Sequence, residues 1–220
     1  MKAYFISGLG ADRRAFYRIQ MPSSIQIVHL DWIDPLPKES LNDYALRFSK
    51  LIDRHEEFIL VGLSFGGMLA VELGKFLQPQ KIILISSLSN NTELPWYFRF
   101  SGKVGLHKLL TPAVYKQATL LNRFMGAGDA EMKAIVYSYV RDIDPRFIRW
   151  SLEAILHWQL AERHPSVIHI HGSKDHLLPL RYVKADFVVE NGGHLMVMNR
   201  PQDVNRILAT ILSPGQASSS

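Results

Sequence analysis

The feature that most constrains the fold is the pentapeptide Gly62-Leu63-Ser64-Phe65-Gly66, which stands between a strand-like and a helix-like segment. The apolar run Phe58-Ile59-Leu60-Val61 precedes it, and a helical pattern follows it as far as Leu77. So tight a turn needs glycines two positions to either side of the serine, because glycine has no Cβ to collide with neighbouring backbone. The pattern predicts a strand, a sharp turn and a helix, with the Ser64 hydroxyl held above the edge of a sheet.

Short apolar, β-branched runs recur along the chain, and helical stretches separate the early ones. Several runs are apolar at consecutive positions, which is typical of parallel strands buried on both faces. We therefore expect an α/β fold with a doubly wound, mainly parallel sheet of about six strands. The predicted strands are Ala3–Ser7, Gln26–Leu30, Phe58–Leu63, Lys81–Ser86, Val167–His171 and Asp186–Val189, and the helices between and after them are Asp12–Ile19, Leu41–His55, Phe65–Leu77 and Asp203–Leu212.

Residues 90–164 contain no convincing strand and are mildly enriched in aromatic residues. These aromatic residues have two possible roles, which are compatible with each other. They can form the small core of a helical insertion, or they can form the underside of a cap that lines a pocket. We predict a core of residues 1–89 and 165–214, a helical cap of 90–164 and a disordered tail at 215–220. The helices predicted in the cap are Pro95–Phe100, Val104–Leu110, Ala113–Leu121, Ala130–Asp142 and Phe147–Arg163.

Composition excludes several classes of protein and of site. The net charge of +5 is spread along the chain without a Lys/Arg run, so no nucleic-acid partner is expected. No apolar stretch approaches the roughly 18 residues of a membrane span, and no signal peptide is evident. These features predict a cytoplasmic protein without membrane contact. The absence of cysteine excludes disulfides, thiolate metal sites and cysteine nucleophiles.

Two later segments supply the partners that a reactive serine needs. A serine hydroxyl requires a general base, and the base requires an acid that orients it. Gly172-Ser173-Lys174-Asp175 follows the fifth predicted strand, and Glu190-Asn191-Gly192-Gly193-His194 follows the sixth. Ligand sites of open α/β sheets lie at the carboxyl ends of the strands, so Ser64, Asp175 and His194 are predicted to meet there.

The chain order Ser64, Asp175, His194 and the pentapeptide resemble the α/β-hydrolase superfamily. The segment H-G-S-K-D-H-L-L-P at 171–179 resembles its acid loop, G-G-H at 192–194 its histidine loop, and the likeness extends from Tyr4 to about Leu212. It implies Ser64 as nucleophile, His194 as general base and then acid, and Asp175 as the group that fixes the imidazole tautomer. It also implies an oxyanion hole made by the backbone N–H groups of Phe65 and Leu9.

The chain departs from the family pattern in two places. Family members usually carry His-Gly in the oxyanion loop, where this chain has Ser7-Gly8, and Ser7 is a smaller substitute for the histidine. The chain also begins with the strand before this loop, so the first two strands of the family's sheet are expected to be absent. The resemblance then implies strand order 2-1-3-4-5-6. One newly exposed edge could invite a dimer contact, which leaves monomer or homodimer open.

Other residues offer rival interpretations. Gly8-Leu9-Gly10 followed by Asp31 imitates a dinucleotide-binding fingerprint, but Arg13 occupies the third glycine position. No histidine–carboxylate cluster has metal-ligand spacing, so neither a metal nor a cofactor is expected. The alternatives for the acid are Asp31, Asp34, Asp142 and Asp144; the alternative histidines include His171 and His176.

The first functional hypothesis is a serine hydrolase that cleaves a small carboxylic ester through an acyl-enzyme. The aromatic cap indicates an apolar acyl or aryl portion in this small-molecule substrate. A second hypothesis keeps the same triad for a C–C-bond hydrolase, a lyase or a perhydrolase. A third is a ligand-binding protein on this fold without catalysis.

Overall fold

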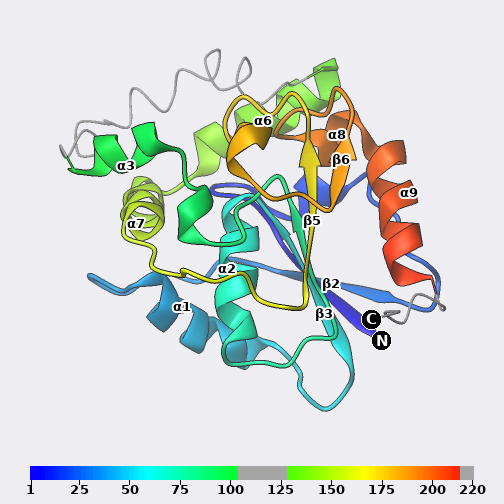
Figure 1. The fold of residues 1–220 in the computed structure, drawn as a ribbon, viewed down its shortest axis with the longest axis horizontal. Coiled ribbons are helices and arrows are strands. Elements are labelled where there is room, and N and C mark those ends of the chain that lie inside the picture. Colours follow the sequence, from blue (N-terminus) through cyan, green and yellow to red (C-terminus); the bar gives the residue numbers. More distant parts are fainter. Residues whose placement is uncertain (104–127, 214–220) are drawn as a thin grey trace.

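Six parallel strands form one sheet in the computed structural model, which describes residues 1–103 and 128–213 (Figure 1). The spatial order is β2-β1-β3-β4-β5-β6, and all five pairings are parallel, as the resemblance to the family implies. Each strand end lies within one residue of its predicted position. The strands are β1 Lys2–Ile6, β2 Gln26–Leu30, β3 Phe58–Leu63, β4 Ile82–Ile85, β5 Val167–Gly172 and β6 Phe187–Val189.

Helices cover both faces of the sheet, which explains the unbroken apolar runs of the central strands. Every residue of β3 and β4 is buried. On one face, α1 (Leu41–Phe48) and α2 (Phe65–Gly74) pack against the sheet. On the other face lie α8 (Met196–Asn199) and α9 (Pro201–Leu212), and Figure 1 shows α9 opposite α1 and α2. The doubly wound α/β architecture is therefore confirmed.

Two predicted core helices are shorter than the sequence suggests. In place of Asp12–Ile19 the chain forms a 3₁₀ helix, η1, over Arg13–Phe16, with the Asp12 carboxylate accepting from the Arg14 N–H at its start. The segment predicted as Leu41–His55 ends its α-helix at Phe48 and continues as a 3₁₀ helix, η2, over Ser49–Leu51. There the Ser49 hydroxyl donates to the Leu46 carbonyl, a local bond that competes with regular helix geometry.

The other two core helices differ from prediction only at their ends. The α2 helix stops at Gly74, before the predicted Leu77. A Cβ at Gly74 would lie 2.8 Å from the Ile82 side chain, so the helix end packs tightly against β4. The α9 helix starts at Pro201, two residues before the predicted Asp203, because proline suits the first turn of a helix.

Between β4 and β5 the described residues are helical and contain no strand, consistent with a cap. They form a 3₁₀ helix, η3 (Asn91–Glu93), and the helices α3 (Trp96–Lys103), α6 (Ala130–Asp142) and α7 (Pro145–Leu156). Figure 1 shows α6 near the end of the sheet toward which β5 points. The predicted helices Val104–Leu110 and Ala113–Leu121 and the predicted tail 215–220 lie outside the described residues.

The α7 helix differs from the predicted Phe147–Arg163 at both ends. It begins at Pro145 because Asp144 caps it, accepting from the Arg146 N–H, which agrees with the predicted capping role of Asp144. It ends at Leu156, and the chain then turns so that the Trp158 indole donates to the Glu72 carboxylate at 2.7 Å. No helix in the described parts of the chain is both long and apolar enough to cross a membrane.

Candidate active site

Ser64 occupies a strained turn between β3 and α2. Its φ is 51° and its ψ is −120°, a positive φ that non-glycine residues rarely adopt outside functional sites. All residues of β3 and α2 are buried, whereas Ser64 between them is partly exposed. The structure confirms that both glycines of the motif are required. A Cβ at Gly66 would lie 2.2 Å from the Ser7 carbonyl oxygen, and a Cβ at Gly62 would lie 2.4 Å from the Gly67 Cα.

The neighbouring strand end holds this turn in place. The Ser64 N–H donates to the Ile85 carbonyl at 2.9 Å, and the Ser87 hydroxyl donates to the Ser64 carbonyl at 2.6 Å. Gly67 makes room for this contact, because a Cβ there would lie 2.3 Å from the Ser87 Oγ. Ser87 is not predicted from the sequence. Its only signal was a small polar residue just after the strand that neighbours the turn.

His194 reaches Ser64 from the loop after β6. Its Nε2 lies 2.9 Å from the Ser64 Oγ, which is hydrogen-bonding distance. The imidazole is 1 % exposed, so it is shielded from water on the side away from the serine. This position suits an imidazole that takes the proton of the Ser64 hydroxyl.

Asp175 lies on the other side of the imidazole, in the loop after β5. Its Oδ2 is 2.8 Å from the His194 Nδ1, and its Oδ1 accepts from the Leu177 and Leu178 N–H groups at 2.9 Å each. Burial alone would raise the pKa of Asp175. The charge and hydrogen bond of His194 and the Leu178 N–H outweigh burial and hold that pKa below its ordinary value. The ionised carboxylate favours the tautomer in which His194 carries its proton on Nδ1.

Close contact between two glycines aligns the loops that carry the acid and the histidine. A Cβ at Gly172 would lie 2.2 Å from the Gly192 carbonyl oxygen. That oxygen accepts from the Lys174 N–H at 2.9 Å, and the Val189 carbonyl accepts from the Ser173 N–H at 3.0 Å. These bonds join the loops directly before the two functional side chains, so the distance between Asp175 and His194 is fixed by backbone.

Two buried histidines of β5 lie behind the acid loop. The His171 Nε2 is 2.7 Å from the Leu178 carbonyl oxygen, and its Nδ1 is 3.1 Å from the His169 Nε2. A carbonyl only accepts, so we assign the His171 proton to Nε2 and infer that His169 donates to the bare Nδ1. Burial lowers the pKa of His171 and lowers that of His169 to about 3, which keeps both rings neutral. His171 is thus a structural support for the acid loop.

The turn after β1 lies directly against the serine. A Cβ at Gly8 would be 3.4 Å from the Ser64 Cβ. Gly8 to Ala11 form a turn closed by the Ala11 N–H donating to the Gly8 carbonyl at 3.0 Å. Within the described parts of the chain, the N–H groups of Leu9 and of Phe65, the first residue of α2, have no protein acceptor. Two unpaired donors beside Ser64 could bind a negatively charged oxygen.

Aromatic residues of the cap pack against the core next to this turn. On α7, the Phe147 ring centroid is 5.2 Å from that of Trp32, and the Trp150 centroid is 5.8 Å from that of Phe65. In contrast, Trp96 and Phe100 of α3 are 64 % and 59 % exposed. Trp150 therefore adjoins the residue that follows Ser64 and Phe147 adjoins Trp32, whereas Trp96 and Phe100 face solvent.

The alternative acids and His176 take no part in the hydrogen bonds among Ser64, His194 and Asp175, whereas His171 lies next to Asp175, with its Nε2 3.5 Å from the Asp175 Oδ2. Asp142 pairs with Arg141, and Asp144 caps α7. Asp31, Asp34 and His176 are exposed. After Gly8-Leu9-Gly10 comes only the short η1 helix, which lacks the long first helix of a dinucleotide fold. Among the described residues, no group of three or more histidines and carboxylates is placed to hold a metal ion.

Comparison with known proteins gives a family and a set of similar folds. A model of the alpha/beta hydrolase family matches residues 3–207. A lipase-esterase related protein from Clostridium acetobutylicum superposes with a TM-score of 0.71 at 16% identity, covering 96% of this chain and 94% of that one. A putative non-heme bromoperoxidase from Mycobacterium tuberculosis superposes at 0.70, with 18% identity over 95% and 90%. No protein with a curated description matches the sequence.

A thermophilic esterase from Thermogutta terrifontis, solved with malate bound, has a TM-score of 0.67 at 13% identity, covering 96% of this chain and 89% of that one. Identities this low establish a shared fold and no shared substrate. The site of this chain therefore has to be interpreted from its own residues.

Proposed function

Because the chain belongs to the alpha/beta hydrolase family, and is therefore a hydrolase, we propose that it cleaves a small carboxylic ester through an acyl-enzyme formed on Ser64. One observation carries the proposal: hydrogen-bonding distances link Asp175, His194 and Ser64 in one chain of contacts, at 2.8 and 2.9 Å. A hydroxyl, a base and an orienting acid in this sequence are the parts of a nucleophilic serine.

Acylation begins when the Ser64 Oγ attacks the ester carbonyl carbon while the His194 Nε2 takes its proton. The carbonyl oxygen becomes negatively charged and is bound by the N–H groups of Phe65 and Leu9, each such donor contributing about 3 kcal/mol. The tetrahedral intermediate then expels the alcohol, which takes the proton from His194. Asp175 stabilises the imidazolium and holds its Nδ1 proton throughout.

Deacylation repeats these steps with water as the nucleophile. His194 removes a proton from water, the resulting hydroxide attacks the acyl carbon, and Ser64 leaves as its alcohol with the proton from His194. The carboxylic acid is released and the enzyme returns to its starting state. Both half-reactions use the same oxyanion donors, so their rigid placement serves the reaction twice.

The surroundings of Phe65 support an apolar acyl or aryl group in the substrate. Trp150 of the cap and Trp32 of the core contact the Phe65 ring, and Phe147 of the cap contacts Trp32. Apolar and aromatic walls with few polar groups are typical of small-molecule pockets. The division into a core of 1–89 and 165–214 and a cap of 90–164 belongs to this proposal. A cytoplasmic location and a monomeric or homodimeric state stay predictions.

Hydrolysis of p-nitrophenyl acetate and butyrate tests the proposal. We expect Ser64→Ala and His194→Ala each to lower kcat by roughly 10³-fold or more. Ser49→Ala is the matched control, because it removes another buried serine hydroxyl, at the start of η2, and should retain wild-type kcat. Wild-type rates in Ser64→Ala would refute the proposal. A wild type that hydrolyses no ester yet reacts with fluorophosphonates would instead favour a C–C-bond hydrolase, a lyase or a perhydrolase.

A further inference from the structure

We propose that Ser7 and Trp32 act as positioning residues for the oxyanion hole. In this inference, which rests on the proposed function, the Trp32 indole fixes the turn that carries the Leu9 N–H and also braces the ring of Phe65. Neither side chain would touch the reacting atoms. Their role is to hold two backbone donors, from different parts of the chain, at one fixed separation.

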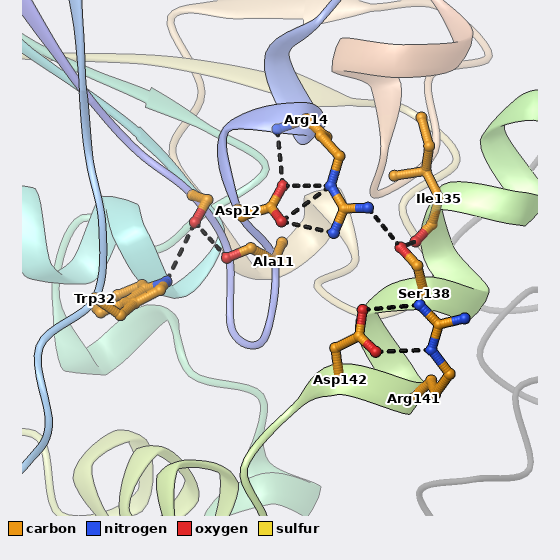
Figure 2. Close-up of polar contacts among 9 residues, drawn as sticks. Ala11, Asp12, Arg14, Trp32, Ile135, Ser138, Arg141 and Asp142 are labelled. Atoms are coloured by element: carbon orange, nitrogen blue, oxygen red, sulfur yellow. Dashed lines mark hydrogen bonds and ion pairs between the residues drawn. The ribbon is translucent and has the colours of Figure 1, made fainter.

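The Ser7 hydroxyl has two partners that define its orientation. It donates to the Ala11 carbonyl at 2.7 Å and accepts from the Trp32 Nε1–H at 3.1 Å (Figure 2). An indole N–H can only donate and a carbonyl can only accept, so the single hydroxyl proton must point to Ala11. Ser7 is 3 % exposed, so water does not compete freely for these bonds.

These bonds span the Gly8–Ala11 turn. Ser7 precedes the turn and bonds to the carbonyl of its last residue, while the Ala11 N–H closes the turn on Gly8. Gly10 has a φ of +69°, which suits glycine, and the Ile143 side chain of the cap fills the space where its Cβ would be, 2.1 Å away. Ser7 therefore links the start of the turn to its last residue, and Ile143 of the cap covers Gly10. Leu9 lies in the chain between Ser7 and Gly10.

Trp32 also contacts the side chain of Phe65, the residue that carries the second donor. Its ring stacks on the Phe65 ring with centroids 5.3 Å apart and planes 17° apart. The Phe65 N–H is the donor next to the nucleophile, and the Phe147 ring of the cap contacts the same indole at 5.2 Å. One side chain from the loop after β2 thus donates a hydrogen bond to the residue before the Gly8–Ala11 turn and stacks on the side chain of Phe65.

Ser7 and Trp32 affect the reaction rate in this inference because an oxyanion hole stabilises the transition state through preorganised donors. Its donors help only when they already point to the position that the charged oxygen will occupy. Without the indole N–H, the Ser7 hydroxyl can rotate to other acceptors and the turn loses one restraint. The cost should fall on the transition state, where the oxygen carries its charge, rather than on substrate binding.

The test compares Trp32→Phe, which keeps an aromatic ring but removes the N–H, with Ser7→Ala. We expect each to lower kcat for p-nitrophenyl butyrate about tenfold, the equivalent of one hydrogen bond, with KM changed less than about threefold. The double variant should be little worse than either single one, because both remove the same chain of bonds. Amide hydrogen exchange of residues 8–11 should be faster in both.

Two matched controls separate positioning from general destabilisation. Trp158→Phe removes a buried indole hydrogen bond to Glu72, and Ser49→Ala removes a buried hydroxyl that donates to a carbonyl and accepts from Arg54. Both should keep wild-type kcat and wild-type exchange in residues 8–11, even where the melting temperature falls.

An active wild type whose Trp32→Phe and Ser7→Ala variants keep its kcat would overturn this inference and leave the proposed function intact. Equal losses of kcat in Trp158→Phe would overturn it too, because they would point to general destabilisation. A wild type that neither hydrolyses esters nor reacts with a fluorophosphonate would remove the proposed function, and this inference with it.

Discussion

Among single residues, Asp175 carries its charge in a buried position. Its carboxylate is buried, yet three hydrogen bonds, from His194 and from two backbone N–H groups, compensate for lost water. That balance lowers the pKa of Asp175, so the carboxylate stays ionised at neutral pH. Its contribution to stability is fully present above its unfolded pKa of about 3.9, and this contribution is lost as the pH falls through the lower pKa of the folded state. The same ionised carboxylate is the group that orients His194 in the proposed mechanism.

Replacing Asp175 by Asn should lower kcat for esters by up to about 10⁴-fold, because the amide favours the wrong tautomer of His194. The matched control is Asp142→Asn, which changes an exposed carboxylate paired with Arg141 and should keep wild-type kcat. Steady-state kinetics at pH 7 check both variants. Near-normal activity of Asp175→Asn would show that another acid orients His194.

Sequence patterns were informative about these residues to different degrees. Ser64 stands in a motif whose glycines have a steric role. Asp175 and His194 each follow a predicted strand, so all three residues could be placed at the same edge of the sheet from the sequence. Ser87 and Trp32 could not, because their partners are a backbone carbonyl and a hydroxyl 23 and 25 positions away. Such contacts depend on how loops fold over one another, which has no signal in local sequence.

Among the elements, strands were predicted better than helices. The central strands β3 and β4 are fully buried, and their apolar runs mark their ends. Helix ends depend on contacts made by individual side chains. The Ser49 hydroxyl donates to the Leu46 carbonyl at the end of α1, and the distant contact of Trp158 with Glu72 accompanies the turn after α7. Propensity along the chain does not record these tertiary and side-chain contacts.

The β5 strand should make stability depend on pH through His169. Its pKa is about 3 in the folded protein, because burial disfavours the charged ring, and about 6.5 when unfolded. The unfolded state therefore binds a proton below about pH 6.5 that the folded state does not, so stability falls as the pH drops from there toward 3. For this group the loss at pH 5 is about 2 kcal/mol.

Replacing His169 by Gln should weaken this pH dependence, since the amide can still donate to His171 but does not titrate. Urea unfolding at pH 7 and pH 5 measures it. His157→Gln, which alters an exposed histidine, should keep the wild-type difference between the two pH values. An unchanged pH dependence in His169→Gln would mean that His169 does not remain neutral in the folded state.

In the molecule as a whole, the cap and the two faces of the core form continuous apolar contacts. Met132 and Val136 of α6 join the cluster beneath α8 and α9, and Ala154 of α7 joins the cluster around α1 and α2. The helical segment between β4 and β5 therefore packs on both sides of the sheet. This arrangement was predictable only as a helical insertion, because amphipathic patterns do not specify which surface they cover.

Contact between α7 and Trp32 makes Phe147 a candidate determinant of substrate size. Phe147→Ala should open space beside Trp32, whose ring stacks on Phe65, and we expect the ratio of kcat/KM for butyrate over acetate esters to rise by about tenfold. Tyr137→Ala removes an exposed aromatic ring from the same cap and should leave the ratio unchanged. A ratio that stays at the wild-type value in Phe147→Ala would place the acyl group elsewhere.

The most direct measurement is the site of reaction with a fluorophosphonate, mapped by mass spectrometry of the digested protein. The nucleophilic chemistry proposed for Ser64, His194 and Asp175 predicts one adduct, on the peptide that contains Ser64, strongly reduced in His194→Ala and lost in Ser64→Ala. An adduct on a different residue, or labelling that persists in Ser64→Ala, would contradict it.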